Sequence, residues 1–348
     1  MEKTKRIRAV LAGLVLIFLL TGCSGSAKGK RAAYVSKSAE YFGTVVTLTL
    51  YGEDEEELKT SIDNAFGECE RLEKIFSARL ADSELYRLNQ TAQDSAMPVS
   101  DELFFLIQNA LHYHEISDGG LDISIGGLID LWGIGTDHAR IPSEQEIEPY
   151  LSRDGCRHIV LDTELQTIRY TDKLVQIDLG AVAKGYAADR LREYLMETEH
   201  ISSATLNLGG NVMALGEKTD GSAFRIGLTD PLYPGEICAV ISVRDRAVVT
   251  SGNYERYFME DGKRYHHILD PQTGCPAERG IISATVIGES SMECDALSTA
   301  CYVLGMDRAM ELVESLDGVE CVLIDEEGKL YRSSGVQDNN FEQLKRER

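Results

Sequence analysis

Strand-like segments occur in clusters along this sequence, and helices separate the clusters instead of following every strand. Short or alternating apolar runs bounded by turn residues predict strands over 44–51, 158–162, 174–178, 204–210, 224–228, 238–243, 247–252, 281–288 and 319–325. A helical period of apolar residues predicts helices over 55–76, 101–116, 181–197, 292–304 and 306–316. This order favours an α+β fold with a mixed sheet and packed helices over a doubly wound fold. Because no shift in composition marks a boundary, we expect residues 36–335 to form a single domain with at most two lobes.

The first 35 residues are expected to lie outside this domain. Four basic residues within positions 3–8 precede the apolar run 9–20, which is too short to span a bilayer and is typical of a secretory signal. The run ends in a Leu-Thr-Gly-Cys box at 20–23, which resembles the processing site of bacterial lipoproteins. This predicts a signal peptide over 1–22, a lipid on Cys23, a flexible tether over 23–35 and attachment to the extracytoplasmic face of a membrane. The alternative is an ordinary signal peptide with a chance cysteine.

Two further properties limit the function. The formal net charge is −22, which argues against a nucleic-acid-binding protein and means that an anionic substrate needs a local cation or a metal ion. The seven cysteines after Cys23 are odd in number, widely spaced and without a CxxC pair, which argues against a disulfide framework and against a dithiol metal site. We expect most of them to be small buried apolar residues. Residues 336–348 are interpreted as a charged tail.

The stretch QIDLGAVAKGYAADRL, residues 176–191, combines an apolar run with a glycine-rich turn at the start of a predicted helix. Gly180 and Gly185 permit close backbone approach and Lys184 adds a positive charge, so the helix end could bind a phosphate. The spacing matches neither a P-loop nor GxGxxG. A helix that simply packs Val182 and Tyr186 inward explains the stretch equally well.

A second group of motifs lies downstream. The segments 250–258 and 264–276 contain small polar residues, a DPQTG turn and the adjacent pair His266 and His267. Neighbouring side chains of an extended segment point to opposite faces, so the two histidines are not expected to chelate one metal ion. Asp295 and Thr299 are four residues apart on a predicted helix, which places a carboxylate and a hydroxyl on one face. Such sparse oxygen sites suit Mg²⁺ when a substrate phosphate completes the shell. The simpler interpretation is an aspartate in the first helical turn that interacts with the helix dipole, beside a packed threonine.

The order of eight segments resembles the ApbE-type FAD:protein FMN transferases, in the form of a bacterial lipoprotein. The eight segments are YFGTVVTLTLYG, FSARLADSELYRLN, GGLDISIGGLIDLWGIG, QIDLGAVAKGYAADRL, LNLGGNVMALG, VVTSGNYERYF, HHILDPQTG and CDALSTACYVLG, and they run from about residue 40 to residue 325. The resemblance implies that residues 36–335 form a catalytic domain that transfers FMN from FAD to a Thr or Ser hydroxyl of acceptor proteins. AMP is then the leaving group, Mg²⁺ is the cofactor, and the acceptors belong to membrane or extracytoplasmic electron-transfer systems.

The resemblance also implies site residues. Metal ligands carry over to the Ala181 carbonyl, Asp295 and Thr299, and catalytic roles to Lys184, Asp295 and His267, the last as the candidate general base. Contacts to FAD carry over to Phe42, Gly43, Thr44, Asn89, Asp122, Lys184, His267 and Ile268. Phe42 stands where the family motif begins with Met. The alternatives are an FAD pyrophosphatase, in which water accepts FMN, and a flavin-binding lipoprotein without catalysis.

Overall fold

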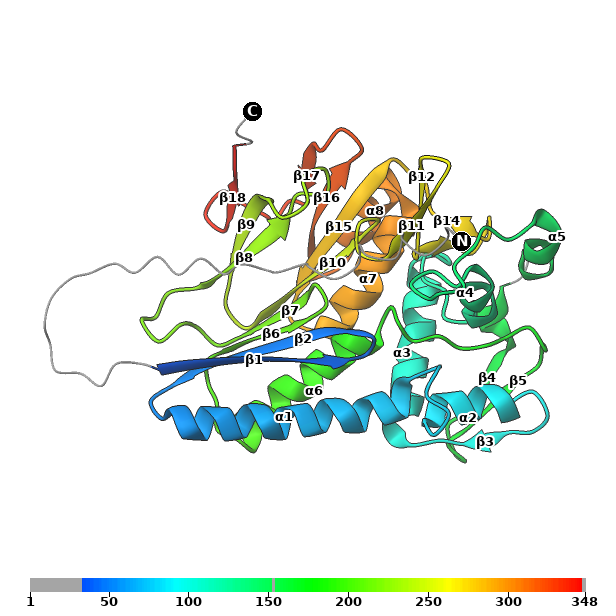
Figure 1. The fold of residues 1–348 in the computed structure, drawn as a ribbon, viewed down its shortest axis with the longest axis horizontal. Coiled ribbons are helices and arrows are strands. Elements are labelled where there is room, and N and C mark those ends of the chain that lie inside the picture. Colours follow the sequence, from blue (N-terminus) through cyan, green and yellow to red (C-terminus); the bar gives the residue numbers. More distant parts are fainter. Residues whose placement is uncertain (1–32, 152–153, 346–348) are drawn as a thin grey trace, which may run out of the picture.

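The structure is a computed structural model that describes residues 33–151 and 154–345, arranged in three layers (Figure 1). Helices cover one face of a large central sheet, and a small sheet covers part of its other face. The predicted signal peptide, Cys23 and most of the tether lie outside the described residues. Within the described residues, no helix is long and apolar enough to cross a membrane.

The central sheet has eight strands in the order β1-β2-β6-β7-β10-β15-β16-β17. Their bounds are β1 (Ala33–Tyr41), β2 (Thr44–Gly52), β6 (Ala204–Leu208), β7 (Asn211–Leu215), β10 (Arg246–Gly252), β15 (Ile281–Gly288), β16 (Glu320–Asp325) and β17 (Leu330–Arg332). All of its ladders are antiparallel, so the α+β class is confirmed while the mixed sheet is corrected. Tight turns join β1 to β2 and β6 to β7, and such turns can only connect antiparallel neighbours.

The helical layer follows the apolar periodicity of the sequence. It contains α1 (Glu55–Phe76), α3 (Asp101–Ile116), α6 (Ala183–Glu197), α7 (Ser291–Leu304) and α8 (Met306–Glu314). The predicted bounds of α1 and α3 are confirmed. Asp54 caps α1 by accepting from the N–H groups of Glu56 and Glu57, and three glutamates in the first turn suit the helix dipole.

The other face of the central sheet packs against β8 (Phe224–Thr229), β9 (Ile237–Val243) and β18 (Phe341–Gln343). Strand β18 pairs with β9, and both Val336 and Phe341 are buried in the core between the two sheets. Residues 336–345 are therefore part of the fold and not a loose charged tail. Their apolar residues are too few and too widely spaced for the sequence to reveal this strand.

A lateral group of short elements flanks the layers. It contains α2 (Glu84–Thr91), β3 (Met97–Pro98), α4 (Gly126–Trp132), α5 (Glu144–Ile147), η1 (Glu148–Tyr150), η2 (Gly155–His158), β4 (Ile159–Asp162) and β5 (Thr167–Tyr170), followed by the hairpins β11 (Tyr257–Glu260) with β12 (Lys263–His266) and β13 (Leu269–Asp270) with β14 (Cys275–Pro276). The predicted strand over 174–178 is wrong. That segment makes one isolated bridge, between Gln176 and Ile125, and the Ile177 N–H donates to the Asn89 side chain instead of to a strand.

Candidate active site

Asp295 and Thr299 lie on one face of α7, as their spacing predicts. Asp295 is buried, and Thr299 is half-buried with its hydroxyl 3.3 Å from that of Ser251 on β10. Burial raises the pKa of the Asp295 carboxyl, and the nearby Lys184 ammonium counteracts the shift. The helix therefore places a carboxylate and a hydroxyl beside the end of a central strand.

Lys184 connects α7 to the loop before α6. Its Nζ donates to the Gly180 carbonyl at 2.7 Å and to the two Asp295 carboxylate oxygens at 3.1 and 3.2 Å. The Gly185 N–H is one of the first N–H groups of α6, which have no partner inside the helix, and it donates to Asp295 at 2.9 Å. The Ala181 carbonyl lies before the helix, next to Val182 at its N-cap. A carboxylate, a hydroxyl and a backbone carbonyl would form an all-oxygen set, which fits the ligand preference of Mg²⁺.

The start of α6 does not offer a row of free N–H groups, contrary to the phosphate-turn interpretation. The Ala183 N–H donates to Leu179, that of Gly185 to Asp295 and that of Tyr186 to Val182. Gly185 serves helix packing instead, because a Cβ there would lie 2.3 Å from the Ser291 carbonyl oxygen. Val182 and Tyr186 are buried, as the packing interpretation predicted. What this turn contributes to the site is Lys184 and the carbonyls before the helix.

Phe42 and Gly43, which together with Thr44 are predicted to contact FAD, form the turn between β1 and β2. Phe42 and Gly43 have φ values of 54° and 63°, and the Phe42 N–H donates to a Glu73 carboxylate oxygen of α1 at 2.7 Å. A Cβ at Gly209 would lie 2.3 Å from Oγ1 of Thr44, so this turn and the β6–β7 turn are in close contact. Two sequence motifs separated by more than 150 residues thus meet at one end of the central sheet.

Arg256 links this turn to the segment that contains His267. It was not among the site residues predicted from the sequence. Its guanidinium donates to the Gly43 carbonyl at 2.9 Å, and its own carbonyl accepts from the His267 backbone N–H at 3.1 Å. Desolvation, followed by the positive charge of Arg79, lowers the pKa of Arg256. The charge of Lys184 also reaches His267. Arg79, Lys184 and Arg256 thus bring positive charge near His267, where the carboxylates of Asp178, Glu255 and Asp295 also lie.

Protein surrounds the ionisable groups beside His267. Glu255 and Arg256 are exposed to solvent, and desolvation by nearby protein raises the pKa of Glu255. His267 is half-exposed, and desolvation together with the charge of Arg256 lowers its pKa to about 3. Its neighbour His266 is buried and contacts the Ala277 carbonyl through Nε2 at 3.1 Å, so the two histidines lie in different surroundings.

Three other residues that are predicted to contact FAD are Asn89, Ile268 and Asp122. Asn89 is buried, and its amide bonds to both the N–H and the carbonyl of Ile177 and to the Tyr170 hydroxyl. Asn89 therefore fixes the segment that leads into Gly180. Ile268 is buried in the main core behind His267. Asp122 accepts hydrogen bonds from Ser124 and from the Cys156 thiol, away from the Lys184–Asp295 pair. Direct FAD contacts of these three residues stay predictions.

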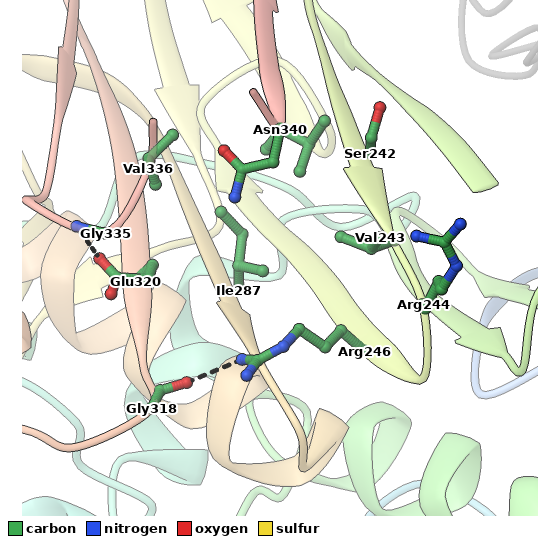
Figure 2. Close-up of a pocket in the computed structure, with 11 residues that line it drawn as sticks. Ser242, Val243, Arg244, Arg246, Ile287, Gly318, Glu320, Gly335, Val336 and Asn340 are labelled. Atoms are coloured by element: carbon green, nitrogen blue, oxygen red, sulfur yellow. Dashed lines mark hydrogen bonds between the residues drawn. The ribbon is translucent and has the colours of Figure 1, made fainter. Parts of the chain in front are cut away.

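A separate cavity of about 310 Å³ lies between the small sheet and the central sheet (Figure 2). Its wall includes Arg244, Arg246, Glu320 and Asn340. Both arginines bond within the protein, Arg244 to Glu217 and Arg246 to the Gly318 carbonyl. None of the site residues predicted from the sequence lines this cavity.

The comparisons with known proteins agree with one another. The sequence model of the ApbE family matches residues 42–323. The FAD:protein FMN transferase of Treponema pallidum is 33% identical over 339 residues, covering 93% of each chain, and that of Klebsiella pneumoniae is 33% identical over 300 residues, covering 86% of this chain and 92% of the relative. The crystal structure of the ApbE protein of Thermotoga maritima has a TM-score of 0.79 at 33% identity, covering 87% of this chain and 97% of that chain. The flavin transferase ApbE of Vibrio cholerae has a TM-score of 0.77 at 28% identity, covering 87% and 98%.

Proposed function

The chain belongs to the ApbE family of FAD:protein FMN transferases, and we propose that it transfers FMN from FAD to a Thr or Ser hydroxyl of acceptor proteins in a Mg²⁺-dependent reaction. The observation that carries the finer proposal is the pairing of Lys184 with Asp295 beside Thr299, next to a second cationic group at Arg256. A binding protein without catalysis has no need for such an oxygen and cation arrangement at a pyrophosphate.

The proposed reaction balances as a single displacement at phosphorus. The acceptor oxygen forms a bond to the FMN phosphorus, the bond from that phosphorus to the AMP oxygen breaks, and the hydroxyl proton passes to a base. Bound Mg²⁺, held by the Ala181 carbonyl, Asp295 and Thr299, would supply charge neutralisation at the phosphate oxygens. Lys184 and Arg256 orient the pyrophosphate and stabilise its charge, because such reactions depend mainly on positioning and electrostatics.

We propose His267 as the base. In the free protein its lowered pKa keeps the imidazole neutral, and therefore able to accept a proton, throughout the neutral range. The same shift makes it a weak base. Binding of the anionic pyrophosphate would offset the charges of Arg256 and Lys184 and raise the pKa of His267 towards the range where a general base is most effective.

A His267→Gln variant is expected to lower kcat of FMN transfer by about 10²- to 10⁴-fold with little change in KM for FAD. In the wild type, activity falls as pH drops through the pKa of the base. The acidic limb of kcat, which reports the FAD complex, should therefore lie at higher pH than that of kcat/KM, which reports the free enzyme. The matched variant is Glu255→Gln, because desolvation by nearby protein raises the pKa of this neighbouring carboxyl. A larger loss in Glu255→Gln than in His267→Gln would assign the base to Glu255.

The activity is tested by incubating the folded domain with FAD, Mg²⁺ and a flavin-acceptor domain. We expect an acceptor whose mass increases by one FMN and whose flavin remains attached after denaturation, with release of one AMP. Parallel reactions without acceptor measure free FMN, which separates transfer from pyrophosphatase activity. FAD binding without any product would instead indicate the non-catalytic binder.

We further propose that the protein is attached to the extracytoplasmic face of a membrane through a lipid on Cys23. The Leu-Thr-Gly-Cys box behind an apolar run of twelve residues is what supports this proposal. It would place the active site near membrane or extracytoplasmic electron-transfer proteins as acceptors. Metabolic labelling with a fatty-acid analogue checks it, since a Cys23→Ala variant should take up no label.

A further inference from the structure

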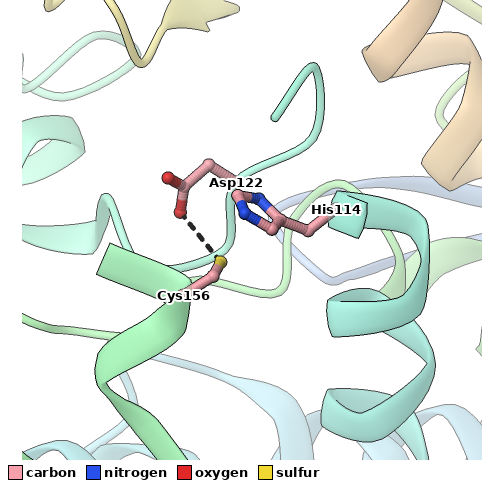
Figure 3. Close-up of side chains that lie close together, drawn as sticks. All are labelled: His114, Asp122 and Cys156. Carbon is pink, nitrogen blue, oxygen red and sulfur yellow. Dashed lines mark hydrogen bonds between the residues drawn. The ribbon is translucent and has the colours of Figure 1, made fainter. Parts of the chain in front are cut away.

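Three side chains with metal-binding atoms meet beyond the end of α3 (Figure 3). His114 lies on the last turn of α3, Asp122 in the loop that follows it, and Cys156 in η2. One ligand atom from each residue lies within 4.8 Å of the others, and Cys156 Sγ is 3.2 Å from Asp122 Oδ1. In a tetrahedral zinc site with bonds of about 2.0–2.3 Å, neighbouring ligand atoms are roughly 3.3–3.8 Å apart. The three side chains are therefore close to ligand spacing already.

The histidine is held in the orientation that a metal ligand needs. His114 Nδ1 lies 2.7 Å from the Leu121 carbonyl oxygen. Because a carbonyl can only accept a hydrogen bond, Nδ1 carries the proton, which leaves the Nε2 lone pair available when the ring is neutral. A backbone carbonyl that fixes the ring and its tautomer in this way is the usual outer partner of metal-binding histidines.

A second observation comes from Asp154. Its Oδ1 lies 3.0 Å from His114 Nε2. This oxygen is buried, and among the described residues its neighbour is His114 Nε2, which donates to it only when the ring is protonated. Buried carboxylate oxygens without a donor are costly. A cation beside Nε2 would satisfy it.

The Cys156 thiol is buried and donates a hydrogen bond to Asp122. A metal ion that displaces the thiol proton would take the place of this hydrogen bond. A thiolate would join the two carboxylates of Asp122 and Asp154 to give three negative charges. One divalent cation together with Arg157, whose Nε lies 2.6 Å from Asp154 Oδ2, balances them.

We propose that His114, Asp122 and Cys156 bind one Zn²⁺ ion in a structural site that is distinct from the Mg²⁺ site of the transfer reaction. A set of one sulfur, one nitrogen and one oxygen ligand suits Zn²⁺, whereas Mg²⁺ prefers oxygen ligands alone. The ion would join η2 to the loop that leads into α4. The proposal assigns the Asp122 carboxylate to zinc, so an FAD contact of this residue would have to come from its backbone. The sequence did not reveal the site because it uses a single thiol and ligands that are up to 42 residues apart.

The test measures zinc bound to tag-free full-length protein after gel filtration in excess Mg²⁺. We expect about one zinc per chain in the wild type, and on substitution with Co²⁺ a near-ultraviolet thiolate-to-cobalt charge-transfer band. Cys156→Ser should abolish the band, and both Cys156→Ser and His114→Gln should weaken zinc binding by more than about tenfold. Thermal unfolding curves, with and without zinc, should show a stabilisation in the wild type that the two variants lack.

Two matched variants distinguish zinc at this cluster from zinc bound elsewhere on the protein. Cys275→Ser removes a half-buried cysteine that is not part of the cluster, and Asp295→Asn removes the proposed Mg²⁺ ligand. Both should retain zinc and the cobalt band. A wild type that retains no zinc, or a His114→Gln variant that folds and retains it fully, would overturn the proposal. His114→Gln keeps this test valid if Cys156→Ser does not fold.

Discussion

An Asp295→Asn variant is expected to lose FMN transfer by about 10³-fold or more while it still binds FAD. The substitution keeps the size of the side chain but removes the negative charge that would hold Mg²⁺, and several kcal/mol of charge stabilisation at the phosphate depend on that ion. Each 1.36 kcal/mol lost changes the rate about tenfold. Initial rates with a flavin-acceptor domain, measured against Mg²⁺ concentration, should show no recovery at high Mg²⁺. FAD binding is measured separately, by fluorescence quenching.

The controls distinguish a lost ligand from a damaged fold. Asp295→Asn leaves the Lys184 ammonium without its carboxylate, which costs up to about 3 kcal/mol of stability. Adding Lys184→Met should restore stability but not transfer. Asp189→Asn is the matched variant, because this half-buried carboxylate accepts from Ser290, Ser291 and Met292 at the start of α7 and has no hydrogen bond to Lys184 among those of the described residues. It should lower Tm and leave kcat nearly unchanged. Retained transfer in a folded Asp295→Asn variant would refute the metal assignment.

A Gly185→Ala variant is expected to destabilise the protein by about 3 kcal/mol or more. The added Cβ would meet backbone atoms of α7, namely the Ser291 carbonyl oxygen at 2.3 Å and the Met292 Cα at 2.6 Å. Backbone cannot rotate away as a flexible side chain can, so the two helices must separate. Separation would also break the hydrogen bond from the Gly185 N–H to Asp295, so transfer activity should fall together with stability.

The measurement is urea unfolding followed by circular dichroism, and the matched variant is Gly67→Ala. Gly67 lies within α1, and a Cβ there would meet no atom within 4 Å. Alanine at this position should stabilise the protein by about 0.5–1 kcal/mol, because it restricts the unfolded chain and favours the helix. We therefore expect alanine to lower the stability of the protein at position 185 and to raise it at position 67. A Gly185→Ala variant as stable as the wild type would show that α6 and α7 are not in close backbone contact.

Local patterning predicted most of the secondary structure. The apolar period sets the bounds of α1 and α3, and β15 coincides with its predicted range because its residues form one nearly continuous apolar run. The segment 174–178 shows the limit of such patterns. Its alternation resembles a strand, yet its N–H groups donate to Asn89 and to the Ile123 and Ser124 carbonyls, which lie in segments distant in sequence. Strand β18 was missed for a related reason, since three residues form a strand only because β9 is beside them.

The sequence by itself determined the groups that are local to one helix or one turn. Asp295 and Thr299 share a face because helical geometry repeats every 3.6 residues. Lys184 at the start of α6 reaches back to the Gly180 carbonyl, four residues earlier in the chain. Only the tertiary structure decided how these groups combine. Lys184 and Asp295 are 111 residues apart, and they meet because Gly185 lets α6 approach the backbone of α7. The sequence also did not reveal the roles of Arg256, Glu255 and the His114 cluster. A charged or polar residue in a turn acquires its role only from the surfaces that the folded chain brings to it.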